Sequence, residues 1–99
     1  MIYVENAKFY KGPGFYIDRA TPLGNLFPLD LGREESIELY RAWLTSKLGD
    51  PGCPAYRYFN FLFMECQLRM DIHLICHCKP LACHGDVIKE FILKRFQHE

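Results

Sequence analysis

Residues 72–87 read IHLICHCKPLACHGDV, and the part from Ile75 to Val87 contains three of the five cysteines and two of the four histidines of the chain. The apolar start of this stretch predicts a strand, its polar middle with a Lys-Pro pair predicts a tight loop, and the amphipathic residues after Val87 predict a helix. We therefore expect function at one junction between a strand and a helix.

The N-terminal half of the chain predicts part of a scaffold for this junction. Two short stretches rich in β-branched and aromatic residues, 2–4 and 14–17, are typical of strands. Residues 33–48 repeat apolar side chains at intervals of three and four, which predicts an amphipathic helix. The turn sequence Gly-Asp-Pro-Gly at 49–52 would end that helix.

A second helix is predicted over residues 54–70, because a proline favours the first helical position. The aromatic residues within 56–63 also suit a strand, which is the alternative for this segment. With a last helix over about 84–97, the order β-β-α-α-β-α predicts an α/β fold, a small layer with a short mixed or parallel sheet. We expect a single domain spanning residues 1–99.

The composition predicts self-association. Hydrophobic residues make up 49% of the chain and aromatic residues 15%, and the chain has only 99 residues in which to bury them. Part of this apolar surface is expected between subunits, so a homo-oligomer is predicted.

The charges and the termini exclude several classes of partner. Twelve basic residues balance twelve acidic ones, so no general positive field attracts duplex nucleic acid or an anionic membrane. No apolar run approaches the roughly 20 residues of a membrane span, and the start MIYVE lacks a secretion signal, which predicts a cytoplasmic protein. An odd number of cysteines in such a protein favours free thiols or a metal site over a disulfide framework.

The segment after the second predicted strand, residues 18–28, has two prolines and no helical periodicity, which predicts an ordered loop. Arg19 offers a planar fork of donors that suits phosphate or carboxylate, and Asn25 can donate to or accept from a base or ribose. We include Gly24 beside it as a ligand-binding candidate. The alternative is a surface charge at Arg19 and ordinary turn residues at 24–25.

The predicted strand-loop-helix junction is also a candidate anion site. A helix N-terminus presents unpaired backbone N–H groups and a partial positive charge. His84 and Gly85 should lie there, with Lys79 near enough to complement a phosphate and Gly85 allowing close approach to the backbone. Arg19 would reach the same rim if the second predicted strand runs parallel to the third.

The same junction allows an enzymatic interpretation. A thiol at a helix N-terminus has a lowered pKa, so Cys83 is the candidate nucleophile, with His84 or His77 as its base. Asp86 could act as a general base or orient His84. The alternatives are a packing cysteine and a carboxylate that matches the helix dipole.

Zinc is the alternative to the expectation of no cofactor. Cys76, Cys78 and Cys83, together with His84 or His77, supply enough thiolate and imidazole for tetrahedral coordination. The spacing of these cysteines is tighter than in the paired knuckles of structural zinc sites, which argues against zinc.

Four stretches carry a resemblance to a known family: YIDR at 16–19, PLGNLF at 22–27, YRAWL at 40–44 and LICHCKPLACHGDV at 74–87. Through them the chain resembles a family of small phage and bacterial proteins known as a domain of unknown function, DUF4326. The resemblance implies a phage or bacterial origin. It also implies that the loop of residues 16–27 pairs with that of residues 76–86 as one surface, and it supplies no reaction.

The chain departs from the family pattern at two positions. Asp18 stands where the family often has Gly, and Leu26 stands where Pro often follows Asn. A glycine at the first position would allow a positive φ or a close ligand approach, which Asp18 does not.

Three functions remain open from the sequence. The leading hypothesis is a protein in the cytoplasm of a bacterium or phage-infected bacterium that binds, and thereby can sequester, a phosphate-bearing nucleotide-like ligand. The first alternative is an enzyme acting on such a ligand through Cys83, His84 and Asp86. The second is a zinc-stabilised module that contacts a protein partner through residues 56–63.

Overall fold

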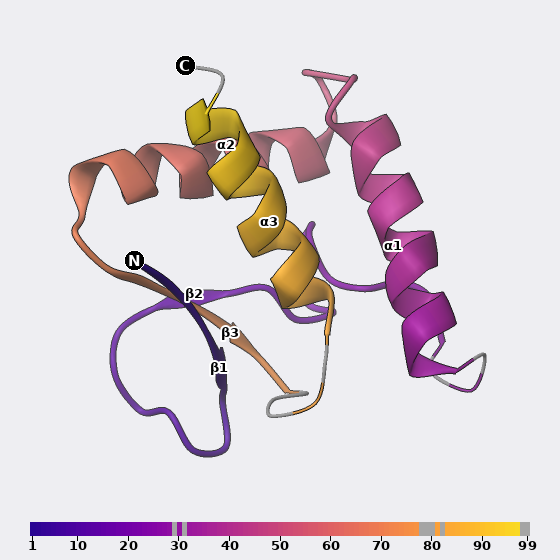
Figure 1. Cartoon of the computed structure of the whole chain (residues 1–99), viewed down its shortest axis with the longest axis horizontal. Helices are drawn as coiled ribbons and strands as arrows, with labels where there is room; N and C mark the ends of the chain where they lie inside the picture. Colours follow the sequence, from indigo (N-terminus) through magenta and orange to yellow (C-terminus); the bar gives the residue numbers. More distant parts are fainter. Residues whose placement is uncertain (29, 31, 78–80, 82, 98–99) are drawn as a thin grey trace.

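The structure is a computed structural model that describes residues 1–28, 30, 32–77, 81 and 83–97. Its elements in chain order are β1 (Ile2–Asn6), β2 (Phe15–Tyr16), α1 (Arg33–Lys47), α2 (Pro54–Leu68), β3 (Ile72–Cys76) and α3 (His84–Gln97) (Figure 1). The predicted α/β class and the order β-β-α-α-β-α are confirmed.

The strand predicted from the start of residues 72–87, here called the motif, is β3, and it is the centre of the sheet. The order is β1-β3-β2, and both neighbours run parallel to β3. β1 pairs along its whole length, from Ile2 opposite Ile72 to Asn6 opposite Cys76, whereas β2 pairs only through its two residues. A central parallel strand is paired along both edges and has both faces covered, and four of the five residues of β3 are buried.

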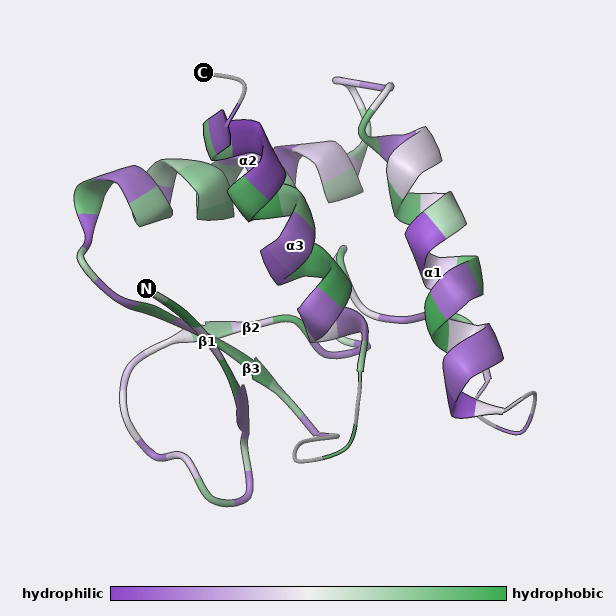
Figure 2. Ribbon diagram, viewed as in Figure 1, coloured by the Kyte–Doolittle hydropathy of each residue, from purple (hydrophilic) through white to green (hydrophobic). Residues whose placement is uncertain are grey.

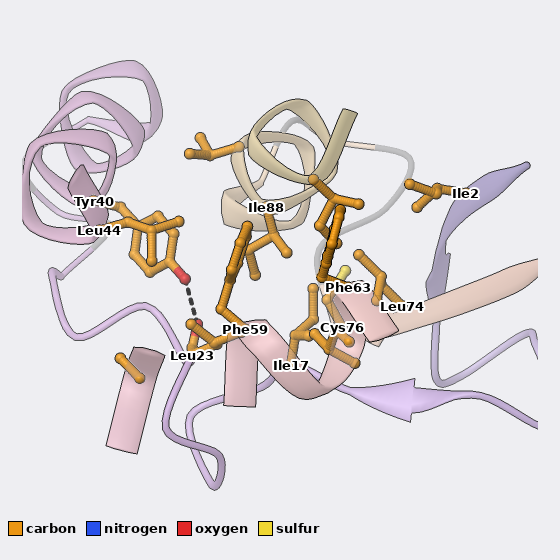
Figure 3. Close-up of a cluster of buried hydrophobic side chains, with 14 of the residues drawn as sticks. Ile2, Ile17, Leu23, Tyr40, Leu44, Phe59, Phe63, Leu74, Cys76 and Ile88 are labelled. Atoms are coloured by element: carbon orange, nitrogen blue, oxygen red, sulfur yellow. Dashed lines mark hydrogen bonds between the residues drawn. The ribbon is translucent and has the colours of Figure 1, made fainter. Parts of the chain in front are cut away.

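The helices lie on one side of the sheet, as Figure 1 shows. Alternate strand residues point to them, and Ile2, Ile72, Leu74 and Cys76 belong to the buried cluster that the helices complete. Figure 3 shows part of this cluster, with Phe63 of α2 and Ile88 of α3 close to the strands. In Figure 2, α1 and α3 carry both hydrophobic and hydrophilic residues, as expected of helices with one buried face.

The segment with two interpretations, residues 56–63, is helical, so the strand alternative is wrong. Local chemistry at the start of α2 explains this result. Pro54 takes the first helical position, and the sulfur of the preceding Cys53 accepts a hydrogen bond from the Tyr56 N–H at 3.4 Å. The aromatic residues then serve packing rather than sheet pairing.

Tyr40 of α1 fastens the long connection after β2 to the core. Its hydroxyl donates a hydrogen bond to the carbonyl of Leu23 at 2.6 Å, and both residues are fully buried (Figure 3). Burial raises the pKa of the Tyr40 hydroxyl well above its usual range, so this group stays protonated and remains a donor.

The opposite face of the sheet is covered by the turn after β1. The ring of His73 stacks between those of Tyr3 and Tyr10, at centroid distances of 4.9 and 4.7 Å. Its Nδ1 is 2.7 Å from a carboxylate oxygen of Glu5. These contacts give His73 a structural environment away from the motif loop.

Large apolar side chains remain exposed where α2 ends and the N-terminus begins, among them Met1, Leu68 and Met70. A homo-oligomer would bury surface of this kind, and that oligomer stays a prediction. None of the helices in the described ranges is long and apolar enough to cross a membrane.

The bond between Tyr40 and Leu23 gives a test of this packing. Replacing Tyr40 by Phe should lower the free energy of unfolding by about 1–2 kcal/mol, because the buried carbonyl of Leu23 loses its donor. Urea denaturation measures the change. Tyr3→Phe is the matched control, since the Tyr3 ring is partly exposed and its hydroxyl has no hydrogen bond within the described residues. Equal stability of Tyr40→Phe and the unsubstituted protein would contradict this account.

Candidate functional site

The candidate site lies at the carboxyl ends of β2 and β3. Because β2 runs parallel to β3, the loop after β2 and the loop after β3 leave the sheet at the same edge. The Ile17 N–H continues the pairing by donating to the Ile75 carbonyl at 2.9 Å. This orientation is the condition under which Arg19 was expected to reach the rim of the motif loop.

A pocket of about 410 Å³ opens between these two loops and α1. Its lining includes four residues from the loop after β2, one from α1 and three from the motif: Asp18, Arg19, Ala20, Asn25, Ile37, His77, Cys83 and His84. The predicted residues Arg19, Asn25, Cys83 and His84 therefore share one pocket wall. Gly24, Gly85 and Asp86 do not line it.

His84 is held by two elements at once. Its Nε2 hydrogen-bonds the carbonyl of Ile17, so Nε2 carries the proton as donor, and its ring meets that of Tyr40 edge to face at 5.1 Å. Within the described chain Nδ1 has no hydrogen-bond partner, and no buried side-chain nitrogen or oxygen there lacks one. In the neutral ring Nδ1 is therefore left as an acceptor, and His84 is one of the residues that line the pocket.

The charge state of His84 follows from its burial. Desolvation lowers the pKa of the ring, and the nearby Arg19 lowers it further, against the opposing effect of the hydrogen bond to Ile17. A lowered pKa keeps the imidazole neutral near pH 7, which preserves Nδ1 as an acceptor.

Asp18 and His77 join the two loops across the mouth of the pocket. His77 Nε2 lies 3.1 Å from one carboxylate oxygen of Asp18, and the other oxygen accepts from the Ala20 N–H at 3.2 Å. Arg19 donates to the carbonyl of Phe27 at 3.3 Å and remains exposed. The rim of the pocket therefore carries one carboxylate together with a guanidinium and an imidazole.

Asn25 is tied into the protein by both ends of its amide. Its nitrogen donates to the hydroxyl of Ser36 at 3.0 Å, and its oxygen accepts from the Phe27 N–H at 3.0 Å. The residue is only 7% exposed. These contacts join the loop to α1 and give Asn25 a structural role beside its place in the pocket lining.

Gly24 and Gly85 are sites of close packing. A Cβ atom on Gly24 would lie 2.3 Å from the carbonyl oxygen of Asp18, and one on Gly85 would lie 2.7 Å from Val4 Cγ1 and 2.9 Å from Ile17 Cδ1. Protein atoms thus occupy the space that was expected to admit a ligand at Gly85. Its role as a binding residue stays a prediction.

A carboxylate of the protein itself, that of Asp86, already occupies the start of α3. The carboxylate of Asp86 accepts from the backbone N–H of Cys83 at 3.1 Å, as in half of a capping box. Asp86 lines a larger open groove of about 660 Å³ beside β1, away from the pocket with the histidines. This geometry matches the alternative in which Asp86 is a carboxylate that complements the helix dipole. Because Asp86 already occupies the start of α3, a phosphate in the pocket would depend less on that dipole.

Cys83 differs from the expected activated thiol. Its sulfur is 3.5 Å from that of Cys76, and this contact, followed by burial, raises the pKa of Cys83. The expectation of a lowered pKa is therefore wrong, because a neighbouring thiol and burial outweigh the helix N-terminus. A catalytic role for Cys83 stays a prediction that this geometry does not favour.

Two of the cysteines of the zinc alternative meet in the structure. Cys76 and Cys83 lie together, while Nε2 of His84 is engaged by Ile17. Cys78 and Lys79 lie outside the described residues. Among the described residues, no group of three or more metal-ligating side chains converges.

Asp18, Ala20 and Ile37 line the pocket but were not among the predicted site residues. Ile37 belongs to the apolar repeat of α1, which predicted packing alone, and Ala20 carries no chemical signal. Asp18 directly precedes Arg19 at the end of a strand, and this position is the sequence signal that favours including Asp18 in the site.

Comparison with family models shows a match to Domain of unknown function (DUF4326) over residues 4–94. The chain belongs to this family, as its motifs predicted. Comparisons with curated proteins and with solved structures find no match.

The lowered pKa of His84 predicts a pH dependence. An unfolded histidine takes up a proton near pH 6.5, whereas the folded His84 resists protonation, so the free energy of unfolding should fall as the pH drops below about 6.5. The slope from this group is at most about 1.4 kcal/mol per pH unit. His84→Gln can still donate to Ile17 but does not titrate. Urea denaturation from about pH 7.5 to 5.5 should therefore show a smaller loss for the variant, and parallel curves would contradict the prediction.

Gly24 provides a test of the loop. Gly24→Ala should lower the free energy of unfolding by about 1–3 kcal/mol, because the added Cβ meets backbone atoms that cannot move alone. Gly52→Ala is the control, since its Cβ would approach only Asp50 Oδ1, at 3.6 Å. Thermal denaturation compares the two, and a Gly24→Ala protein as stable as Gly52→Ala would refute the close packing.

Proposed function

We propose that the pocket between the two loops binds a small phosphate-bearing, nucleotide-like ligand. The observation that carries this proposal is the convergence of Arg19, His77 and His84 on one pocket of about 410 Å³. Sites for small molecules are commonly of roughly 300–1,000 Å³, so a mononucleotide-sized molecule suits this volume.

Each group at the pocket matches part of such a ligand. The Arg19 guanidinium, with donors beyond the one used on Phe27, and the His77 imidazole suit a phosphate at the rim. Ile37 and Ala20 supply an apolar surface for a base. Nδ1 of His84 accepts from an amino or hydroxyl group, and the carboxylate of Asp18 accepts from a ribose hydroxyl.

The chemistry of the pocket favours binding over turnover. The raised pKa of Cys83 keeps its sulfur protonated, and Asp86 caps α3 outside the pocket. Burial lowers the pKa of His84, which favours its neutral form, and the Ile17 carbonyl holds the ring in one tautomer. The groups that face the pocket therefore recognise a ligand, and none of them is an activated nucleophile.

Thermal denaturation with a panel of nucleoside monophosphates tests the proposal. A ligand present at ten times its dissociation constant stabilises the fold by about 1.4 kcal/mol. For a chain of this size that is a rise in Tm of roughly 5–10 °C. Nucleosides without phosphate and inorganic phosphate alone should give smaller shifts, because each lacks one half of the recognised molecule.

Arg19→Ala should remove most of the shift, and Arg57→Ala should keep it. Arg57 is exposed on α2 and does not line the pocket, so it controls for the loss of one positive charge. The absence of a shift with every member of the panel would count against the proposal. An equal shift in both variants would place the ligand elsewhere.

A further inference from the structure

The sulfur atoms of Cys76 and Cys83 lie in contact in the core. They are 3.5 Å apart, and Cys76 and Cys83 are 0% and 2% exposed. Cys76 is the last residue of β3, and Cys83 directly precedes α3. Because the strand and the helix are each packed into the core, the contact between the two sulfurs is set by the fold on both sides of the segment 77–82.

We propose that Cys76 and Cys83 are a reversible modification site. The two cysteines form a disulfide bond with each other, and a small-molecule disulfide, such as oxidised glutathione, is the oxidant. The sulfurs of a disulfide are about 2.05 Å apart, so the two atoms must approach by roughly 1.5 Å. Each sulfur can turn about its own Cα–Cβ bond, and this rotation is the movement that the proposal requires.

The pocket supplies the route for the oxidant. Cys83 lines it, whereas Cys76 is fully enclosed behind it. The Cys83 sulfur, after losing its proton, attacks the small disulfide, whose S–S bond breaks and releases one thiol. Cys76, after losing its proton, then attacks the Cys83 sulfur and releases the second thiol. The protein loses two electrons and two protons, and the small disulfide gains both.

The rate of this exchange should depend on pH. The contact with Cys76 and burial raise the pKa of Cys83, so only a small fraction of this sulfur is thiolate near neutral pH. Because the thiolate is the attacking form, each pH unit in the range from about 7 to 9 should speed oxidation about tenfold.

The bond would join the end of β3 to the start of α3. His77 follows one of the two cysteines and His84 follows the other, and both histidines line the pocket. Oxidation therefore acts on one wall of the pocket. The formation of the bond rests on the two sulfurs alone and does not depend on which ligand the pocket binds.

Equilibration in glutathione buffers of increasing oxidation, followed by acid quenching, denaturation and alkylation, tests the proposal. Trypsin should release residues 70–89 as one peptide, because Lys79 is followed by proline. In Cys78→Ser protein this peptide has only Cys76 and Cys83, so the bond leaves it unalkylated and lighter by two hydrogen atoms. We expect the native protein to reach half oxidation at a certain ratio of oxidised to reduced glutathione. This ratio should be about tenfold lower than the ratio that the same protein needs in urea.

Matched variants and the original chain complete the test. Adding Cys66→Ser should leave the bond unaffected, because Cys66 lies on α2, and adding Cys76→Ser should abolish it. In the unsubstituted protein, fragmentation of the same peptide should find the alkyl group on Cys78. The proposal is overturned if the native protein needs as much oxidant as the unfolded chain, or if the bond includes Cys78.

Discussion

The candidate site depends on the hydrogen bond from Nε2 of His84 to the carbonyl of Ile17. Ile17 continues the pairing of β2 with β3, so this bond fastens the start of α3 to the edge of the parallel sheet. The bond is buried, and loss of either partner would leave an unsatisfied polar group at a cost of about 1–3 kcal/mol. It also assigns the proton to Nε2, which leaves Nδ1 as the acceptor of the neutral ring.

Several polar groups of the motif loops stabilise the architecture around this bond. Asn25 connects its loop to α1 through Ser36, and Asp86 caps α3. Arg19, His77 and His84 line the pocket, and they are the side chains to which the proposed function assigns ligand contacts. The family motif thus combines residues that build a parallel strand-loop-helix junction with residues that can contact a ligand there.

The fold was largely predictable because each element has a local cause in the sequence. The apolar run of β3 suits a central parallel strand, and the repeat of Tyr40 and Leu44 suits one buried face of α1. For α2 the aromatic composition was ambiguous between helix and strand. The cap by Cys53 and the proline after it favour the helix, and the buried residues recur with its period.

The sequence by itself determined the fold class, the order of the elements and the family, and it predicted a candidate site at the end of β3. The tertiary structure decided that β2 runs parallel to β3, which brings Arg19 to His84, and that Ile37 from α1 joins the pocket. It also decided the chemistry of Cys83, because the pKa of a thiol depends on burial and on neighbouring groups such as Cys76. Helical and strand periods are local properties of a chain, whereas contacts and desolvation arise between segments that only folding brings together.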